Sequence, residues 1–70
     1  MAGSARDSLY WDDAYPIALA LHAAHPDVDP AALSVHILYE WVIGLDGFAD
    51  DPVLTTSDWL ERIQAEWTEL

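Results

Sequence analysis

The sequence Trp-Val-Ile-Gly-Leu-Asp-Gly-Phe-Ala-Asp-Asp-Pro, residues 41–52, joins the clearest helical pattern of the chain to its densest group of carboxylates. Apolar residues recur in and before it at spacings of three, four and seven, which place them on one face of a helix. These residues are Leu38, Trp41, Val42 and Leu45. Gly47 is expected to end that helix, because glycine readily takes the left-handed backbone angle that many helix C-termini need.

The second half of this stretch is predicted to be an acidic loop. Phe48 should fold back onto the core, while Asp46, Asp50 and Asp51 stay in water. Pro52 lacks a backbone N–H and prevents a strand or helix from running through the loop. We therefore expect a short anionic loop that is held in place by one aromatic side chain.

Upstream, the sequence predicts a helix that starts after an N-cap at Asp12 or Asp13 and ends at His25. Aspartate is a favoured N-cap, and the residue before Pro26 is disfavoured in the helical region. The expected buried stripe is Ile17, Leu21 and Ala24, with Trp11 against the start of the helix and Leu19 exposed.

A short second helix, Pro30–Leu33, is predicted with Asp29 as its cap, since proline suits a first helical position. The helix that carries the Trp41 stripe should then begin between Ser34 and Ile37. At most a vestigial strand is expected near Val35 or at residues 53–54.

A last helix is predicted after a capping box in which Thr55 is the cap and Asp58 replaces the usual glutamate. Its buried face is expected to comprise Leu60, Ile63 and Trp67. Asp58, Arg62 and Glu66 follow one another at steps of four, a spacing that favours ion pairs along one side of a helix. Four short helices with irregular connections predict an all-α domain over residues 9–70, preceded by a flexible lead-in at residues 1–8.

The composition points to a folded and strongly anionic protein. The 70 residues include 13 acidic residues, two arginines and no lysine, for a formal net charge of -11, yet 53% are hydrophobic. Binding to a phosphate backbone or to an anionic membrane needs lysine and arginine, so neither nucleic acid nor a membrane is an expected partner. Mutual repulsion of such anions favours a monomer.

Other classes of function find little support in the residues. The absence of cysteine removes disulfides, thiolate nucleophiles and sulfur ligands. The serines and glycines form neither a nucleophile elbow nor a phosphate-binding loop, so we expect no enzymatic activity. No apolar run is long enough to span a bilayer and no secretory signal is evident, which makes the cytoplasm the expected location.

The carboxylates of the loop allow two interpretations. Asp46, Asp50 and Asp51 could bind a hard cation weakly, since carboxylate oxygens are its usual ligands, although their spacing matches no calcium-binding loop. Alternatively, the loop is solvated and acts only through its charge. The histidines lack the third and fourth ligands that a zinc site requires.

In register, the chain resembles the IscX family, small acidic proteins associated with iron–sulfur cluster assembly in bacteria. The matching motifs are Leu9-x-Trp11-x-Asp13, Ile17 with Leu21, residues 25–30 (His-Pro-Asp-Val-Asp-Pro), Trp41-Val42, Leu45-Asp46-x-Phe48, Asp50-Asp51-Pro52, Leu60-Glu61-x-Ile63 and Trp67. The resemblance implies a small orthogonal helical domain with a modified winged-helix-like fold. It also implies a non-catalytic regulator that binds the PLP-dependent cysteine desulfurase IscS, binds Fe(II) weakly and competes with or assists the bacterial frataxin.

For partner binding, we expect an acidic face to meet a basic protein surface with strong salt dependence. The residues predicted for this contact are Asp12, Asp13, Asp46, Asp50 and Asp51, and Fe(II) would share the last three. Two alternatives stay open: an iron carrier that supplies the assembly scaffold, and an acidic mimic that blocks a basic nucleic-acid-binding surface.

Overall fold

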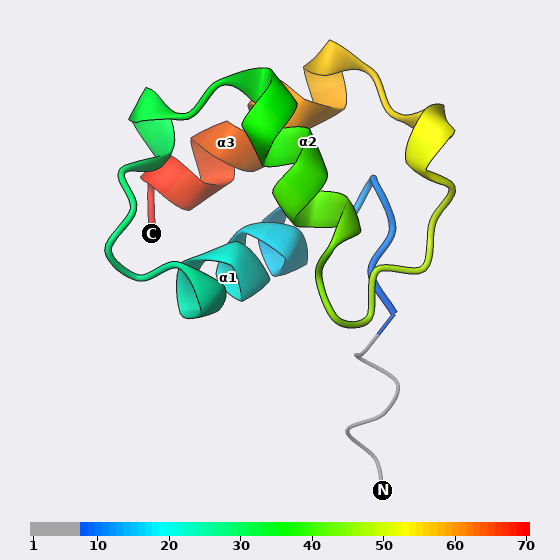
Figure 1. The fold of residues 1–70 in the computed structure, drawn as a ribbon, viewed down its shortest axis with the longest axis horizontal. Coiled ribbons are helices and arrows are strands. Elements are labelled where there is room, and N and C mark those ends of the chain that lie inside the picture. Colours follow the sequence, from blue (N-terminus) through cyan, green and yellow to red (C-terminus); the bar gives the residue numbers. More distant parts are fainter. Residues whose placement is uncertain (1–7) are drawn as a thin grey trace, which may run out of the picture.

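A computed structural model describes residues 8–70, so the predicted lead-in lies, except for Ser8, outside the described residues. This part of the chain folds into three α-helices joined by loops and two 3-10 turns (Figure 1). In chain order the elements are α1 (Ala14–Ala24), η2 (Pro30–Ala32), α2 (Val35–Ile43), η3 (Pro52–Leu54) and α3 (Ser57–Thr68). The prediction of an all-α domain is confirmed.

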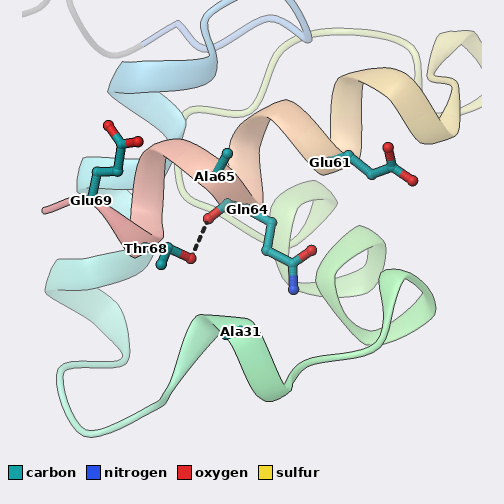
Figure 2. Close-up of a pocket in the computed structure, with 6 residues that line it drawn as sticks. All are labelled: Ala31, Glu61, Gln64, Ala65, Thr68 and Glu69. Atoms are coloured by element: carbon teal, nitrogen blue, oxygen red, sulfur yellow. Dashed lines mark hydrogen bonds between the residues drawn. The ribbon is translucent and has the colours of Figure 1, made fainter.

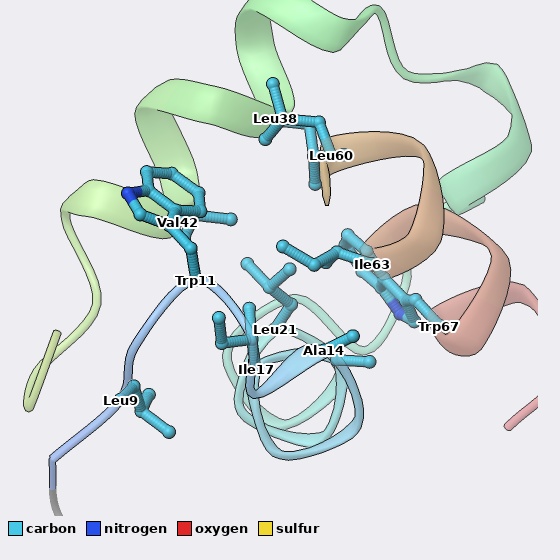
Figure 3. Packing of buried hydrophobic residues seen from close by; sticks show 11 residues of the cluster. Leu9, Trp11, Ala14, Ile17, Leu21, Leu38, Val42, Leu60, Ile63 and Trp67 are labelled. Atoms are coloured by element: carbon cyan, nitrogen blue, oxygen red, sulfur yellow. The ribbon is translucent and has the colours of Figure 1, made fainter. Parts of the chain in front are cut away.

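The core forms where α1, α2 and α3 meet, and α3 packs chiefly against α1 (Figure 3). Its fully buried large side chains are Ile17, Leu21, Leu38, Val42 and Ile63. Leu60 and Trp67 are also buried, as their spacing predicts. Each such side chain stabilises the fold by about 1.5–3 kcal/mol through apolar burial, so this cluster supplies most of the driving force for folding.

Helix α1 starts and ends where the sequence predicts. Asp13 occupies the N-cap position, but its carboxylate accepts a hydrogen bond from the Tyr10 amide at 3.0 Å instead of capping a helical amide. His25 is the C-cap. Leu19 is exposed as expected, whereas Ala24 is also exposed, so its assignment to the buried stripe is wrong.

The predicted second helix is a single 3-10 turn, η2, in which Asp29 accepts a hydrogen bond from the Ala31 amide at 3.1 Å. Ser34 then caps α2 by accepting from the Ile37 amide at 3.3 Å, within the predicted range for the helix start. Val35 is the first residue of that helix, so the strand suggested there is not formed. The other suggested strand, residues 53–54, is part of η3.

Helix α2 ends earlier than predicted. It stops at Ile43 with Gly44 as C-cap, so the prediction that Gly47 ends the helix is wrong. The amide of Leu45 donates to the carbonyl of Val42 at 3.1 Å, which tightens the chain into a turn. Gly47 does take the expected left-handed angle, with φ of 89°, but it uses it inside the loop.

This early end places two predicted anchors of the stripe at the margin of the core. Leu45 and Trp41 are half-buried, whereas the stripe predicts full burial. The Trp41 ring stacks on the His25 ring with 3.9 Å between centroids, so it covers the end of α1.

The start of α3 differs from the prediction by one residue. Thr56, and not Thr55, is the N-cap and accepts a hydrogen bond from the Trp59 amide at 3.4 Å. Within residues 8–70 one pair lies within salt-bridge distance, Nε2 of His36 and Oε2 of Glu40 at 3.3 Å, and it is an ion pair only when the imidazole is protonated. The ion pairs predicted along α3 for Arg62 are therefore absent from this part of the chain.

The winged-helix-like fold that the resemblance implies is not confirmed. In residues 8–70 the β structure is limited to one isolated parallel bridge between Leu9 and Phe48, and no strand is present that could form a wing. None of the helices described is both long and apolar enough to span a bilayer.

Candidate functional site

Residues 9–11 and the acidic loop lie side by side, although about forty residues separate them in sequence (Figure 1). The amide of Leu9 donates to the carbonyl of Gly47 at 2.8 Å, and the amide of Ala49 donates to the carbonyl of Leu9 at 2.9 Å. These two bonds form the parallel bridge. They bring the predicted acidic residues of both segments to one end of the molecule.

The buried side chain and backbone of Trp11 attach the segment before α1 to the acidic loop. Its side chain is only 2% exposed, and its backbone amide donates to Oδ2 of Asp50 at 2.9 Å. Its indole Nε1 donates to the carbonyl of Asp51 at 2.8 Å. The ring meets Phe48 edge-on at 4.9 Å between centroids and lies parallel to Tyr39 at 6.1 Å. The Tyr39 hydroxyl also donates to the carbonyl of Pro52 at 3.2 Å. The loop is thus held by three aromatic side chains, Trp11, Tyr39 and Phe48, whereas the sequence indicates one.

Two carboxylates of the loop have structural partners. Both oxygens of Asp50 accept hydrogen bonds, one from the Trp11 amide and one from the Asp51 amide at 2.8 Å. Asp51 caps η3 by accepting from the Val53 amide at 3.1 Å. Asp50 is half-buried, so the expectation that it stays in water is only partly right. These groups order the loop in addition to charging it.

The other predicted carboxylates are more accessible. Asp12 and Asp46 are exposed, and Asp13 is half-buried beside the Tyr10 amide. Asp12, Asp13 and Asp50 line one shallow hollow, together with Tyr10, Trp11, Leu54 and Trp59. Asp13 also lines the neighbouring hollow with Asp46. Four of the five predicted residues therefore border two adjoining hollows that share Asp13; we call this region the acidic face.

The metal prediction finds no assembled site. Among residues 8–70, no three side chains of histidine, aspartate or glutamate converge closely enough to hold a metal ion. Asp46, Asp50 and Asp51 share a loop, but both oxygens of Asp50 and one of Asp51 already accept backbone hydrogen bonds. Each of these oxygens keeps a second lone pair. A cation bound there would still need further ligands, because no third carboxylate or histidine converges on the same point within residues 8–70. The residues in this conformation do not fit a preformed Fe(II) site.

A further hollow lies between η2 and α3 and is lined by Ala31, Glu61, Gln64, Ala65, Thr68 and Glu69 (Figure 2). The Gln64 side chain donates from Nε2 to the carbonyl of Pro30 at 2.6 Å and to that of Leu33 at 3.2 Å. The Thr68 hydroxyl donates to the Gln64 carbonyl at 2.8 Å. Gln64 therefore attaches η2 to α3, and this hollow is a packing junction.

Sequence reasoning missed two features of the acidic face. It placed Trp11 against the start of α1 but gave no sign of its bonds to the loop, because such bonds depend on the tertiary fold. It also overlooked that Val53 and Leu54 project into solvent beside the acidic residues. Two apolar residues between Pro52 and two threonines were a readable signal.

Comparison with known proteins agrees with the motifs of the sequence. The family model described as iron-sulphur cluster assembly matches residues 9–70. The chain is also 42% identical over 62 residues to the uncharacterized protein PA3808 of Pseudomonas aeruginosa, covering 89% of this chain and 94% of that protein. This chain therefore belongs to the iron–sulphur cluster assembly family, the IscX family.

Proposed function

We propose that this protein is a non-catalytic accessory protein of iron–sulfur cluster assembly that docks on the cysteine desulfurase IscS through its acidic face. It acts there by altering how fast the desulfurase releases sulfur, in competition with the bacterial frataxin. The proposal places it in the cytoplasm as a monomer. Membership of the family supports the pathway, and the residues of the acidic face support the mode of contact.

The observation that carries the proposal is the joining of two anionic segments by Leu9 and Trp11. A single surface carboxylate contributes little to the rate of association, but several held on one ordered face raise the rate of encounter with a basic surface. Residues 8–70 contain a single arginine, Arg62, against 12 acidic residues, so most of the described surface repels other anions. A cationic protein surface is the partner that this charge distribution favours.

The proposal assigns no role to iron, and Fe(II) is only added or left out in the assay that tests it. Weak Fe(II) binding by Asp46, Asp50 and Asp51 stays a prediction, and no step is assigned to the metal because these side chains form no preformed site. A carrier that delivers iron to the scaffold would need a defined ligand set, so the structure gives the carrier alternative no specific support.

The test is a binding and turnover assay with purified cysteine desulfurase. Wild-type protein should bind at low salt, lose affinity steeply as salt rises and change the rate of sulfide release. The double variant Asp12→Asn with Asp46→Asn removes two exposed charges that accept no hydrogen bond within residues 8–70, and it should weaken binding mainly at low salt. Frataxin should displace the wild-type protein.

Unchanged sulfide release at saturating protein, with and without Fe(II), would contradict the regulatory role. Transfer of iron to the scaffold under those conditions would favour the carrier alternative. Binding to a basic nucleic-acid-binding protein, in place of the desulfurase, would favour the mimic.

A further inference from the structure

The most exposed large apolar side chains of residues 8–70 lie next to the acidic face. Val53 is 78% exposed and Leu54 is 63% exposed, and both belong to η3. Single exposed apolar residues are ordinary, but two consecutive large apolar residues on one turn, each more than half exposed, leave an unusual amount of apolar surface in water at one place in the chain. Neither residue belongs to the hydrophobic core or to the side chains packed against it, so the pair has no packing role within residues 8–70.

The turn that carries the pair is firmly ordered. Asp51 caps it through the Val53 amide, and its carbonyl accepts from the Leu54 amide at 3.0 Å as well as from the Trp11 indole. The Tyr39 hydroxyl donates to the carbonyl of Pro52 at 3.2 Å. A surface that is ordered before binding loses little conformational entropy when a partner arrives, so these bonds favour recognition.

The surroundings of the turn combine aromatic and acidic groups. Leu54 shares its hollow with Tyr10 and Trp59, and the same hollow is bordered by Asp12, Asp13 and Asp50. Aromatic side chains at the centre of a contact and charged groups at its edge are the usual anatomy of a protein interface. Beyond Trp59 the next hollow contains Asp58, Glu61 and Arg62, so carboxylates outnumber cations on that side too.

These charges decide which occupant fits the apolar turn. A second copy of the chain would bring a net charge of -11 against the same acidic groups, which opposes self-association. A surface rich in lysine and arginine would instead attract the carboxylates at the edge of the turn, so no repulsion would oppose this contact. An apolar recess within that surface would take the exposed pair out of water.

From these contacts we infer that the turn carrying Val53 and Leu54 is the apolar centre of the docking surface, and that it inserts into an apolar recess bordered by lysine and arginine on the partner protein. This inference rests on the proposed function, which supplies the desulfurase as the partner. It adds a division of roles: the carboxylates govern the rate of encounter, and the apolar pair governs how long the complex lasts.

The test measures association and dissociation of purified cysteine desulfurase with three variants at about 50 mM and about 300 mM salt, on either side of the range where screening becomes strong. Val53→Ser with Leu54→Ser should raise Kd about tenfold at both salt concentrations, through faster dissociation. Asp12→Asn with Asp46→Asn should slow association mainly at low salt. Leu70→Ser is the matched control, because Leu70 is 46% exposed and lies at the opposite end of the long axis (Figure 1).

The outcomes separate a failure of this inference from a failure of the proposed function. If the serine pair binds within twofold of wild type while the asparagine pair is weakened, the inference is overturned and the proposed function stands. If wild-type protein does not bind the desulfurase at low salt, the proposed function fails and the inference fails with it. A concentration-dependent dimer that the serine pair abolishes, measured by sedimentation, would assign the turn to a second copy. Unchanged thermal unfolding of the serine pair shows that the fold is intact.

Discussion

The indole N–H of Trp11 donates a hydrogen bond of 2.8 Å to the main-chain carbonyl of Asp51, which lies 40 positions further along the chain. This bond connects the segment before α1 to the turn that presents the exposed apolar pair. Trp11 is therefore a structural support of the acidic face, and its own side chain is buried.

Replacing Trp11 by phenylalanine should destabilise the protein by about 2–4 kcal/mol, because it combines a lost buried hydrogen bond with a smaller ring in the core. Urea unfolding followed by circular dichroism measures the loss. Trp59→Phe is the matched control, since Trp59 is half-buried and its ring nitrogen donates no hydrogen bond within residues 8–70. Equal losses for both variants would contradict the anchoring role of Trp11.

Asp50 should matter to stability more than its neighbours in the loop. Asp50→Ala leaves the amides of Trp11 and Asp51 without their acceptors and should cost about 1–3 kcal/mol. The matched variant Asp46→Ala removes an equal charge from an exposed site and should change stability by less than about 0.5 kcal/mol. Denaturant midpoints compare the two, and a larger effect at Asp46 would refute this assignment.

That difference limits what charge reversal in the loop can reveal. Lysine at positions 50 and 51 would repel a basic partner, but it would also remove the acceptors that order the loop and cap η3. Lost binding by such a variant would have two causes. Changes at Asp12 and Asp46 separate charge from structure, because both side chains are exposed and accept no hydrogen bond within the described part of the chain.

Sequence patterns predicted the helices because their signals are local. Asp29, Ser34 and His25 cap or end their elements through contacts with residues two to four positions away, and those contacts are readable from spacing. The apolar stripes of Leu60 with Ile63 and of Leu38 with Val42 are likewise periodic. The class of fold and most helix boundaries follow from such short-range rules.

The acidic face was predicted as a set of residues but not as a structure. Its carboxylates were chosen for their charge, whereas the bridge of Leu9 to Phe48 and the bonds of Trp11 arise between segments distant in sequence. Choosing between two adjacent threonines at the start of α3 failed for a related reason, because both Thr55 and Thr56 satisfy the local rule for a cap. Tertiary packing decides such cases.

The two glycines around the end of α2 should respond in opposite ways to alanine. Gly47 has φ of 89°, where a β-carbon is strained, so Gly47→Ala should destabilise the protein by about 1–2 kcal/mol. Gly44 has φ of -88°, and a β-carbon there would lie 3.4 Å from the nearest atom, the Glu40 carbonyl oxygen. Gly44→Ala should therefore be neutral or stabilise by up to about 1 kcal/mol. Thermal unfolding of both variants checks the prediction, and a Gly44 variant that is the less stable of the two would contradict it.

Gln64 should hold η2 against α3 through its amide group. Gln64→Leu keeps much of the side-chain volume but removes both donors to the carbonyls of Pro30 and Leu33, so the protein should lose about 1–2 kcal/mol. Hydrogen exchange should show the loss locally, because the Ala32 and Leu33 amides close the η2 turn by bonding to Asp29 and Pro30. Their exchange should accelerate, while amides in the middle of α2 change only as global stability does. Arg62→Ala, on the exposed side of the same helix, is the control and should leave η2 protected. Unchanged exchange at Ala32 and Leu33 in the Gln64 variant would mean that η2 is held by the apolar contacts of its neighbours and not by this amide.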